Sequence, residues 1–495
     1  MGRILMNIEK LSDRGVFAFL FLYGLLIRLP FFFRDYVDRD ESSFIIMGQS
    51  VVDGHLPYTQ LWDIKPPVIF FFFALIIYVF GKSFIAIRLI GVALVAITAF
   101  FTYKLTNINN AKRIALCFGA LCVILQSLFG SLQGVMSEHI AMAFFTPAIY
   151  FMAKTKTKAS TWLLCGVLVG LGLMVKLNLA YVALFLGCTI LTLDFIKIRS
   201  IKSLSSSMLF GIGVLIVIVA CFLPYYLTDN SSLWWKSVVE APLAYAGARQ
   251  YSPFKLLMYL MPCLLLFWIG FKKGIFQFKN RATVFLLAAT LGTILAFIKS
   301  GRVNGHYLIL IYPVILPLVA TTFSKASAIR FKYSTTMIIA LLALIPMESY
   351  LEYYAIFKNK TEKNTFYNGE GITVPAYFEH NQLSTNNVYF AEYHIGYWMM
   401  GIQPITKAAT QPSNVLKDEM FFAYDNPRKT GEEELKHILE VIKPQYIVTR
   451  KNRRVFDEKK KAVNFYINLQ LLTSYTPLDT IDNAIIHKRQ HLEVQ

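Results

Sequence analysis

Long apolar segments recur along most of the chain, and each approaches the length that a helix needs to cross a membrane. Of the 495 residues, 56% are hydrophobic and only 16% are charged. A soluble protein of this length does not repeat such segments, so the sequence predicts a polytopic α-helical membrane protein with about eleven transmembrane helices. The apolar segments lie near residues 15–33, 85–103, 114–134, 139–153, 161–176, 178–194, 207–227, 254–271, 282–298, 307–323 and 335–351.

Basic residues occur in every second gap between these segments. The net charge of +19 could suit a nucleic-acid-binding protein, but the Lys and Arg residues concentrate in short gaps that are nearly free of acids. The positive-inside rule explains this alternation, so we expect no nucleic acid partner, a cytoplasmic N-terminus and an extracytoplasmic C-terminal region in a multi-pass cell-membrane protein. The basic gaps hold Arg3, Lys10 and Arg14; Lys104, Lys112 and Arg113; Lys154, Lys156 and Lys158; Lys197, Arg199 and Lys202; Lys272, Lys273, Lys279 and Arg281; and Lys325, Arg330 and Lys332.

The alternation holds only if the apolar stretch "PPVIFFFFALIIYVFG" (66–81) does not span the membrane. It opens with two prolines and is flanked by Lys65 and Lys82. The preceding amphipathic segment, "ESSFIIMGQSVVDG" (41–54), is too short to cross. Both segments therefore predict interfacial helices in the first outer loop.

Acidic and basic residues are mixed only in the gaps on the predicted outer side. Ionisable groups at the ends of apolar helices are costly unless they are paired or functional, so this pattern indicates a site at the outer face. The residues concerned include Asp40, Glu41, Asp63, Lys65, Glu138, Lys176, Lys236, Glu240, Arg249, Lys299, Arg302, His306 and Tyr307.

Transfer of a sugar at this face would need a carboxylate to take a proton from the acceptor hydroxyl, and fixed positive charge for a phosphate leaving group. Asp40 or Glu41 could be the base, because adjacent carboxylates repel each other and burial would raise the pKa of one of them. Cations that could meet the phosphate are Lys65, Lys176, Arg249, Lys299 and Arg302.

Each of these residues also has a purely structural explanation. Asp40 and Glu41 could be a solvated pair beside the membrane, and Lys65 could snorkel from the start of an interfacial helix. Lys176 could simply end a helix, and Tyr307 could anchor one at the interface. Spacing alone does not decide between the two readings.

Six blocks in sequence order resemble the GT-C glycosyltransferases. The similarity covers about residues 15–325, and the most similar branch contains the protein O-mannosyltransferases and the aminoarabinose transferases of lipid A. The blocks are "DE" (40–41), "GHLPYTQLWDIKPP" (54–67), "FGKSFIAIRL" (80–89), "MSEHIA" (136–141), "GLGLMVKLN" (170–178) and "KSGRVNGHYLILIYP" (299–313).

The resemblance implies a role for each matching residue. Asp40 would be the catalytic base with Glu41 as its partner, and Lys65 would meet the donor phosphate. The donor would be a sugar on polyprenyl phosphate, transferred with inversion to a hydroxyl of a lipid, glycan or protein. The resemblance further implies substrate-side roles for Glu138, which could shape the acceptor side or a metal site, and for Lys176, Arg302, His306 and Tyr307; Asp63, Glu240 and Arg249 are weaker substrate-binding candidates.

The sequence departs from the aminoarabinose branch at several positions. That branch has Arg-Tyr shortly after "DE" and Glu before "KP", where this chain has Ser43, Phe44 and Ile64. It also has His where Ala241 follows Glu240. These differences argue against aminoarabinose as the sugar and leave a divalent metal as no more than possible.

Other functions fit parts of the same pattern. A flippase or transporter of lipid-linked sugars would share the lipid donor, but it predicts charges near mid-membrane in repeated, broken helices. An oligosaccharide ligase or polymerase that uses pyrophosphate-linked glycans would share the outer-face site, and a non-catalytic relative would use the charges only to bind lipid.

The chain becomes polar after about residue 352. We therefore expect a transmembrane domain over 1–352 and a small extracytoplasmic α/β domain over 353–495. Predicted strands lie at 387–391, 445–450, 472–479 and 483–489, and predicted helices follow the first strand within 392–401 and lie at 430–444 and 459–470.

Overall fold

The computed structural model describes residues 10–35, 38–128, 130–154, 158–198, 205–248, 253–300, 304–326, 342–456 and 460–490. The chain is mostly helical and forms two compact units. The first unit comprises Met1–Phe31, Arg88–Leu223 and Arg249–Glu352, and the second comprises Phe32–Ile87, Pro224–Ala248 and Tyr353–Gln495. The second unit thus combines the C-terminal region with two segments from the predicted outer loops.

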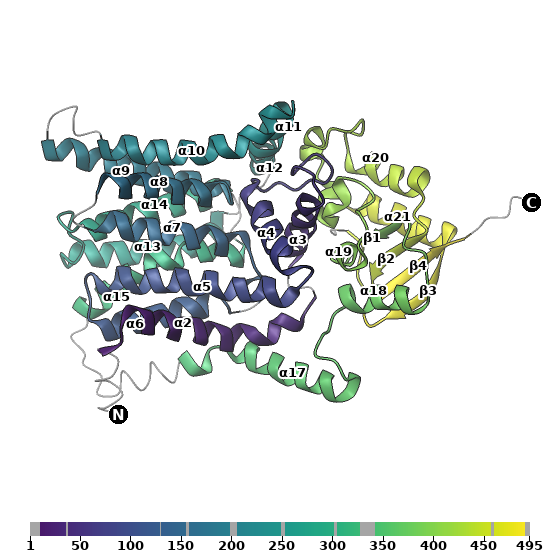
Figure 1. The fold of residues 1–495 in the computed structure, drawn as a ribbon, viewed down its shortest axis with the longest axis horizontal. Helices are drawn as coiled ribbons and strands as arrows, with labels where there is room; N and C mark the ends of the chain where they lie inside the picture. Colours follow the sequence, from purple (N-terminus) through teal and green to yellow (C-terminus); the bar gives the residue numbers. More distant parts are fainter. Residues whose placement is uncertain are drawn as a thin grey trace, which may run out of the picture. The chain divides into compact units, whose positions relative to one another are not determined.

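Apolar helices make up the first unit, and they run along a common direction (Figure 1). The apolar helical fold that the sequence predicts is confirmed. The helices, two of which begin or end in the second unit, are α2 (Asp13–Arg28), α5 (Phe84–Asn107), α6 (Lys112–Leu125), α7 (Ser137–Ala153), α8 (Ala159–Leu173), α9 (Ala180–Ile198), α10 (Ser205–Leu227), α13 (Pro253–Lys272), α14 (Arg281–Ser300) and α15 (Tyr312–Ala326), with 3₁₀ turns η1 (Leu29–Phe33), η2 (Gly130–Gln133), η3 (Leu177–Leu179) and η6 (Gly305–Leu310).

Five helical segments of the described residues are long and apolar enough to cross a membrane by themselves. Others, such as Ala159–Leu173 and Leu260–Lys272, are apolar but shorter. The total of eleven spans therefore stays a prediction, and part of the eleventh, 335–341 of 335–351, lies outside the described residues. The five segments are Asp13–Phe33, Phe84–Asn107, Leu177–Ile196, Ser205–Leu227 and Arg281–Ser300.

Small residues let neighbouring helices of this unit approach closely. Gly166 of α8 faces Gly213 of α10, and a Cβ at Gly166 would lie 2.1 Å from the carbonyl oxygen of Phe210. Close backbone approach at small residues is a main source of helix association in membranes. A larger side chain at either glycine would force α8 and α10 apart.

A buried arginine fixes the loop that leads into α7. Arg28, at the end of α2, is 1% exposed. Its guanidinium donates to the carbonyl oxygens of Leu132 at 2.6 Å, Gln133 at 3.0 Å and Gly134 at 2.6 Å. These charge-assisted bonds compensate for burying the cation, and they hold the chain just before α7 begins.

The second unit contains the two helices predicted in the first outer loop, α3 (Arg39–Val52) and α4 (Val68–Phe80). They pack through Phe44, whose ring centroid lies 5.9 Å from that of Phe73, and at Gly48, where a Cβ would lie 2.7 Å from the Phe73 Cβ. Helices of 14 and 13 residues are about 20 Å long, shorter than the roughly 30 Å apolar core of a bilayer. Their interfacial position stays a prediction.

A four-stranded mixed sheet forms in the C-terminal region, in the order β1-β2-β4-β3. The strands are β1 (Val388–Phe390), β2 (Tyr446–Arg450), β3 (Tyr475–Ile481) and β4 (Ala484–Arg489). β1 pairs parallel to β2, with Tyr389 opposite Ile447, and the other pairs are antiparallel. The predicted alternation of helices and strands is confirmed.

Short helices complete the second unit (Figure 1). The stretch around 408–423, for which the sequence predicts no element, folds into three consecutive 3₁₀ turns. The elements are α11 (Ser231–Trp235), the π-helix η5 (Lys236–Glu240), α12 (Ala241–Gly247), α17 (Met347–Lys363, which begins in the first unit), α18 (Glu370–His380), α19 (Gly396–Met400), the 3₁₀ turns η7 (Ala408–Thr410), η8 (Pro412–Leu416) and η9 (Asp418–Ala423), α20 (Gly431–Lys436), the π-helix η10 (His437–Ile442) and α21 (Lys461–Ser474).

Candidate active site

The acidic doublet begins helix α3. Asp38 caps the helix, and its side chain accepts a hydrogen bond of 2.8 Å from the backbone N–H of Asp40. Asp40 and Glu41 occupy the first turn, where the helix dipole favours negative charge. Consecutive helical residues do not face each other, so the two carboxylates point in different directions. Glu41 is buried, at 1% exposure, and the Asp40 side chain is 28% exposed.

Both oxygens of the Asp40 carboxylate are held. The Lys65 ammonium lies 3.2 Å from Oδ2, and the Gln411 amide donates to Oδ1 at 2.8 Å. The Lys65 side chain is 16% exposed and Gln411 is 5% exposed, so the carboxylate is the most accessible member of the group. We call Asp40, Lys65 and Gln411 the Asp40 group.

The backbone around Lys65 is also fixed. Its N–H donates to Asp63 Oδ1 at 3.1 Å, and its carbonyl accepts the Tyr58 hydroxyl at 2.6 Å. Its ammonium lies 5.7 Å from the ring centroid of Phe44, a favourable cation–π distance. Two prolines then lead into α4, so the lysine stands on a rigid segment.

Asp63 is a buried carboxyl beside this group, with 2% exposure. Burial raises the pKa of Asp63 to about 6, and the Asp40 charge acts in the same direction. Lys65 and Lys417 oppose the shift, because their positive charges favour the ionised form. Asp63 therefore positions Lys65 through its backbone and titrates closer to neutral pH than an ordinary aspartate.

Gln411 was not predicted from the sequence. It lies 371 residues after Asp40, in the polar stretch "TQPSN", which carries no recognisable motif. Its amide is oriented by Ser413, whose hydroxyl donates to Gln411 Oε1 at 2.8 Å. No local signal could have found it, because only folding brings the C-terminal region to the start of α3.

Residues that follow β1 also hold the first turn of α3. Arg39 forms an ion pair with Glu392, and His394 Nε2 lies 3.1 Å from the carbonyl oxygen of Arg39 and 3.2 Å from Ser43 Oγ. Burial lowers the pKa of His394 to about 3, and the Arg39 charge contributes to that shift. The imidazole is thus neutral at physiological pH, and its hydrogen bonding holds the first turn of α3 in place.

A second charged group lies in the first unit, and its four members are all candidate site residues predicted from the sequence. The Lys176 ammonium is 2.7 Å from Glu138 Oε1, and His306 Nε2 is 3.8 Å from the same oxygen. Glu138 also accepts a 2.9 Å hydrogen bond from the hydroxyl of Ser137. The Lys176 ammonium lies 4.4 Å from the ring centroid of Tyr307. We call Glu138, Lys176, His306 and Tyr307 the Glu138 group.

Packing of three segments of the first unit brings the Glu138 group together. Glu138 is in the first turn of α7, where the His139 ring accepts a 3.1 Å hydrogen bond from the backbone N–H of Met136. Lys176 stands between α8 and η3, and His306 and Tyr307 lie in η6. The Glu138 side chain is fully buried, so the Lys176 ammonium balances a charge that water cannot reach.

The predicted site residues therefore separate into sets. Asp40, Asp63 and Lys65 come together in the second unit, while Glu138, Lys176, His306 and Tyr307 come together in the first. Glu240 is exposed in η5, and no hydrogen bond or ion pair of its side chain to another described residue is found. Arg249 and Arg302 lie outside the described residues. The chemical role of each residue stays a prediction.

The described side chains do not fit a metal ion. Across the described ranges, no three His, Cys, Asp or Glu side chains come close enough to hold one. Glu138 has only His306 as a neighbouring ligand type within its group. We therefore derive no step through a metal.

Comparisons with known proteins agree with this architecture. A family described as dolichyl-phosphate-mannose-protein mannosyltransferase matches residues 64–227. The undecaprenyl phosphate-alpha-4-amino-4-deoxy-L-arabinose arabinosyl transferase 1 of Proteus mirabilis is 25% identical over 338 residues, which cover 63% of this chain and 59% of that relative. The chain thus matches less than two thirds of that relative's length.

Solved structures share the fold over nearly the whole chain. The apo structure of ArnT from Cupriavidus metallidurans covers 96% of this chain and 98% of its own, with a TM-score of 0.59 and 11% identity. The structure of the same protein bound to undecaprenyl phosphate covers 95% and 97%, with a TM-score of 0.55 and 11% identity. In sequence and in fold, the chain therefore resembles the GT-C membrane glycosyltransferases, in the branch of the protein O-mannosyltransferases and the aminoarabinose transferases.

Proposed function

We propose that this protein is a membrane glycosyltransferase that transfers a sugar from a polyprenyl-phosphate donor to a hydroxyl of a lipid, glycan or protein acceptor. The observation that carries the proposal is the partly exposed Asp40 carboxylate, held between the Lys65 ammonium and the Gln411 amide. A fixed base beside a fixed cation is what transfer from a phosphate leaving group requires. The relative from Proteus mirabilis, whose printed name includes undecaprenyl phosphate, supports this donor class.

In the proposed reaction, the acceptor oxygen attacks the anomeric carbon of the donor sugar. The bond from that carbon to the phosphate oxygen breaks, the acceptor proton passes to Asp40, and polyprenyl phosphate leaves. A single displacement inverts the anomeric configuration. Each oxygen of an ionised carboxylate has two acceptor sites, so Asp40 can keep Lys65 and Gln411 and still receive the acceptor hydroxyl.

Lys65 has two tasks in this proposal. Its ammonium carries three N–H donors, so it can hold Asp40 and also donate to an oxygen of the donor phosphate. The electrostatic stabilisation that this ammonium provides then increases as negative charge develops on the leaving group. The fixed segment from Asp63 to the prolines keeps this cation in place during the reaction.

The Glu138 group is the second part of the proposal. Lys176 and His306 would supply charge and hydrogen bonds to the donor, and Glu138 would hold Lys176 in position before and after the donor binds. The Tyr307 ring gives the Lys176 ammonium a second partner through a cation–π contact. This contact does not compete with phosphate for the ammonium. Arg249 and Arg302 remain proposed cations of the donor site.

We further propose that the reaction takes place at the outer face of the membrane. The alternation of basic gaps supports a cytoplasmic N-terminus and an extracytoplasmic C-terminal region. Gln411 belongs to that region, so the base and its amide partner would meet outside the cytoplasm.

Purified protein in proteoliposomes, supplied with radiolabelled sugars on undecaprenyl phosphate and a membrane extract as acceptor source, tests the function. We expect label to move into a product that resists the mild acid used to cleave the donor. In cells that lack the gene, the lipid-phosphate sugar should accumulate and one glycan decoration should disappear. Movement of the donor between leaflets without a new product would contradict the proposal and favour a flippase.

A further inference from the structure

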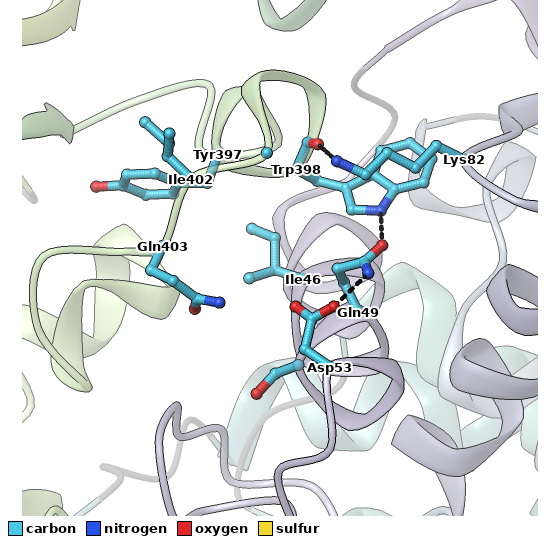
Figure 2. Close-up of a pocket in the computed structure, with 10 residues that line it drawn as sticks. Ile46, Gln49, Asp53, Lys82, Tyr397, Trp398, Ile402 and Gln403 are labelled. Atoms are coloured by element: carbon cyan, nitrogen blue, oxygen red, sulfur yellow. Dashed lines mark hydrogen bonds between the residues drawn. The ribbon is translucent and has the colours of Figure 1, made fainter. Parts of the chain in front are cut away.

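A small pocket lies in the second unit at the C-terminal end of α3 (Figure 2). Its cavity volume is about 110 Å³. A cavity of about 150 Å³ can hold one benzene molecule, so an open pocket of this size suits part of a single six-membered ring. We call it the Asp53 pocket; its walls are Ile46, Gln49, Ser50, Asp53, Lys82, Tyr397, Trp398, Gly401, Ile402 and Gln403.

A chain of hydrogen bonds orients the polar wall of the pocket. The Trp398 indole N–H donates to Gln49 Oε1 at 3.1 Å, and the Gln49 amide donates to Asp53 Oδ1 at 2.9 Å. Lys82 donates to the Trp398 carbonyl oxygen at 2.7 Å and so fixes the turn that carries the indole. The Asp53 carboxylate is therefore held in one orientation before any ligand arrives.

The planar polar groups on the two sides of the pocket suit hydroxyl groups. Figure 2 shows Gln403 across the hollow from Gln49 and Asp53. A carboxylate accepts two hydrogen bonds side by side, and an amide both donates and accepts, so together they can bind neighbouring hydroxyls of one ring. Ile46 and Ile402 add apolar wall that can contact the C–H groups of such a ring.

Charge argues against other ligand classes. An anion such as a phosphate would face the Asp53 carboxylate, whose negative charge offsets the positive charge of Lys82, so the pocket offers no net positive charge to hold it. A lipid chain would displace the water that solvates the exposed Asp53 and Gln403 side chains without replacing its hydrogen bonds, which is costly. A neutral, hydroxyl-rich group satisfies the wall without either penalty.

The pocket and Asp40 lie at opposite ends of the same helix. Asp40 is in the first turn of α3, and Asp53 is its C-terminal cap. The helix rises 1.5 Å per residue, so the two carboxylates are separated by about 20 Å. A ligand that reaches both must be extended, with its reacting hydroxyl at Asp40 and a different unit in the pocket.

We propose that the Asp53 pocket binds a neutral sugar unit of the acceptor glycan, several units away from the hydroxyl that receives the transferred sugar. This proposal rests on the proposed function, because it assigns the acceptor class of the same site. The bound unit would be a neutral pyranose, recognised through its hydroxyls by Asp53, Gln49 and Gln403.

Saturation-transfer NMR on the full-length protein in nanodiscs tests binding directly. The probes are methyl α-mannoside, methyl α-glucoside and methyl β-N-acetylglucosaminide. We expect at least one probe to bind and the double change Asp53→Asn with Gln403→Ala to weaken it by about tenfold or more, because hydrogen bonds to a charged group are lost. Glu379→Gln, an exposed change on α18, is the matched control and should leave binding intact. Absence of binding by all three probes, or binding that the double change does not affect, would overturn the proposal.

The transfer assay separates this proposal from the proposed function. Asp40→Asn should lower transfer by about 10²- to 10⁴-fold and keep glycoside binding, because Asp40 lies at the other end of α3. Asp53→Asn should raise KM for the acceptor more than it lowers kcat. If the wild-type protein binds glycosides but transfers no sugar, the proposed function fails and the acceptor role fails with it, while the binding result stands by itself. If transfer occurs but KM is unchanged in Asp53→Asn, only the acceptor role of the pocket is refuted.

Discussion

Two carboxylate–lysine pairs, one in each unit, differ in their exposure to water. The Asp40 side chain is 28% exposed and lies 3.2 Å from the Lys65 ammonium. The Glu138 side chain is fully buried and lies 2.7 Å from the Lys176 ammonium. A pair that water reaches can exchange partners at low cost, whereas a buried pair cannot lose one member without leaving an uncompensated charge. We therefore predict that the first pair takes part in the reaction and that the second acts as a fixed structural charge.

The strongest test of this contrast is removal of the proposed base. Asp40→Asn keeps the size of the side chain but cannot take a proton, so we expect transfer in proteoliposomes to fall by about 10²- to 10⁴-fold. The thermal unfolding midpoint should change little, because an amide can still accept a hydrogen bond from Lys65. Normal turnover by a folded Asp40→Asn protein would refute the assignment.

Substitutions in the buried pair should lower the stability of the protein. Glu138→Ala or Lys176→Ala leaves one buried charge alone, and we expect the free energy of unfolding in nanodiscs to fall by about 3–5 kcal/mol. The double change Glu138→Gln with Lys176→Met should lower the free energy of unfolding by less than either single change does. The exposed pair of Lys358 and Glu362 is the control, and Glu362→Ala should have no measurable effect. Single changes that are as mild as this control would show that the buried pair is not a fixed structural charge.

Removal of Gln411, the amide partner of the base, should lower transfer less than Asp40→Asn does. Gln411→Ala removes one charge-assisted hydrogen bond of about 1.5–3 kcal/mol, so kcat should fall about tenfold to a hundredfold with little change in KM for the donor. Gln411→Glu places a second carboxyl beside Asp40, and it should move the acidic limb of the pH–rate profile to higher pH because like charges disfavour ionisation.

A purely structural role for Gln411 would lower the amount of folded protein and leave that limb where it is. Gln470→Ala, on α21, is the control and should change neither quantity. A Gln411→Glu protein with an unshifted profile would therefore contradict contact between Gln411 and the base during turnover.

The smallest expected effect concerns the pH dependence of stability. Because burial raises the pKa of Asp63 to about 6, the folded state favours its protonated form. Its contribution to stability is therefore complete below the ordinary aspartate pKa of about 4 and is lost as the pH rises through about 6. Chemical unfolding between pH 4 and 7 should show this decline in the wild type and lack it in Asp63→Asn. Equal slopes for the two proteins would argue that Asp63 is not buried in solution.

Sequence patterns were sufficient where local physics decides the structure. Apolar runs predicted the helices of the first unit, because burial of such segments depends on their own composition. The amphipathic segment 41–54 predicted the helix that forms as α3, and the apolar and polar pattern after residue 386 predicted the strands and helices of the C-terminal region. The members of the Glu138 group could be predicted because they lie in the gaps on the predicted outer side and in blocks that resemble the family, although their mutual contacts could not be derived.

Tertiary structure alone decided which distant residues meet. Gln411 reaches Asp40 from 371 residues away, and the sheet order β1-β2-β4-β3 is not the order of the strands in the sequence. The units also divide the chain differently from its change in composition, since 32–87 and 224–248 fold with the C-terminal region. Such contacts depend on the packing of whole elements, and a hydrogen bond between two side chains leaves no trace in the local pattern around either one. Local composition thus determined which segments form helices and strands, and packing determined which charged residues share a site.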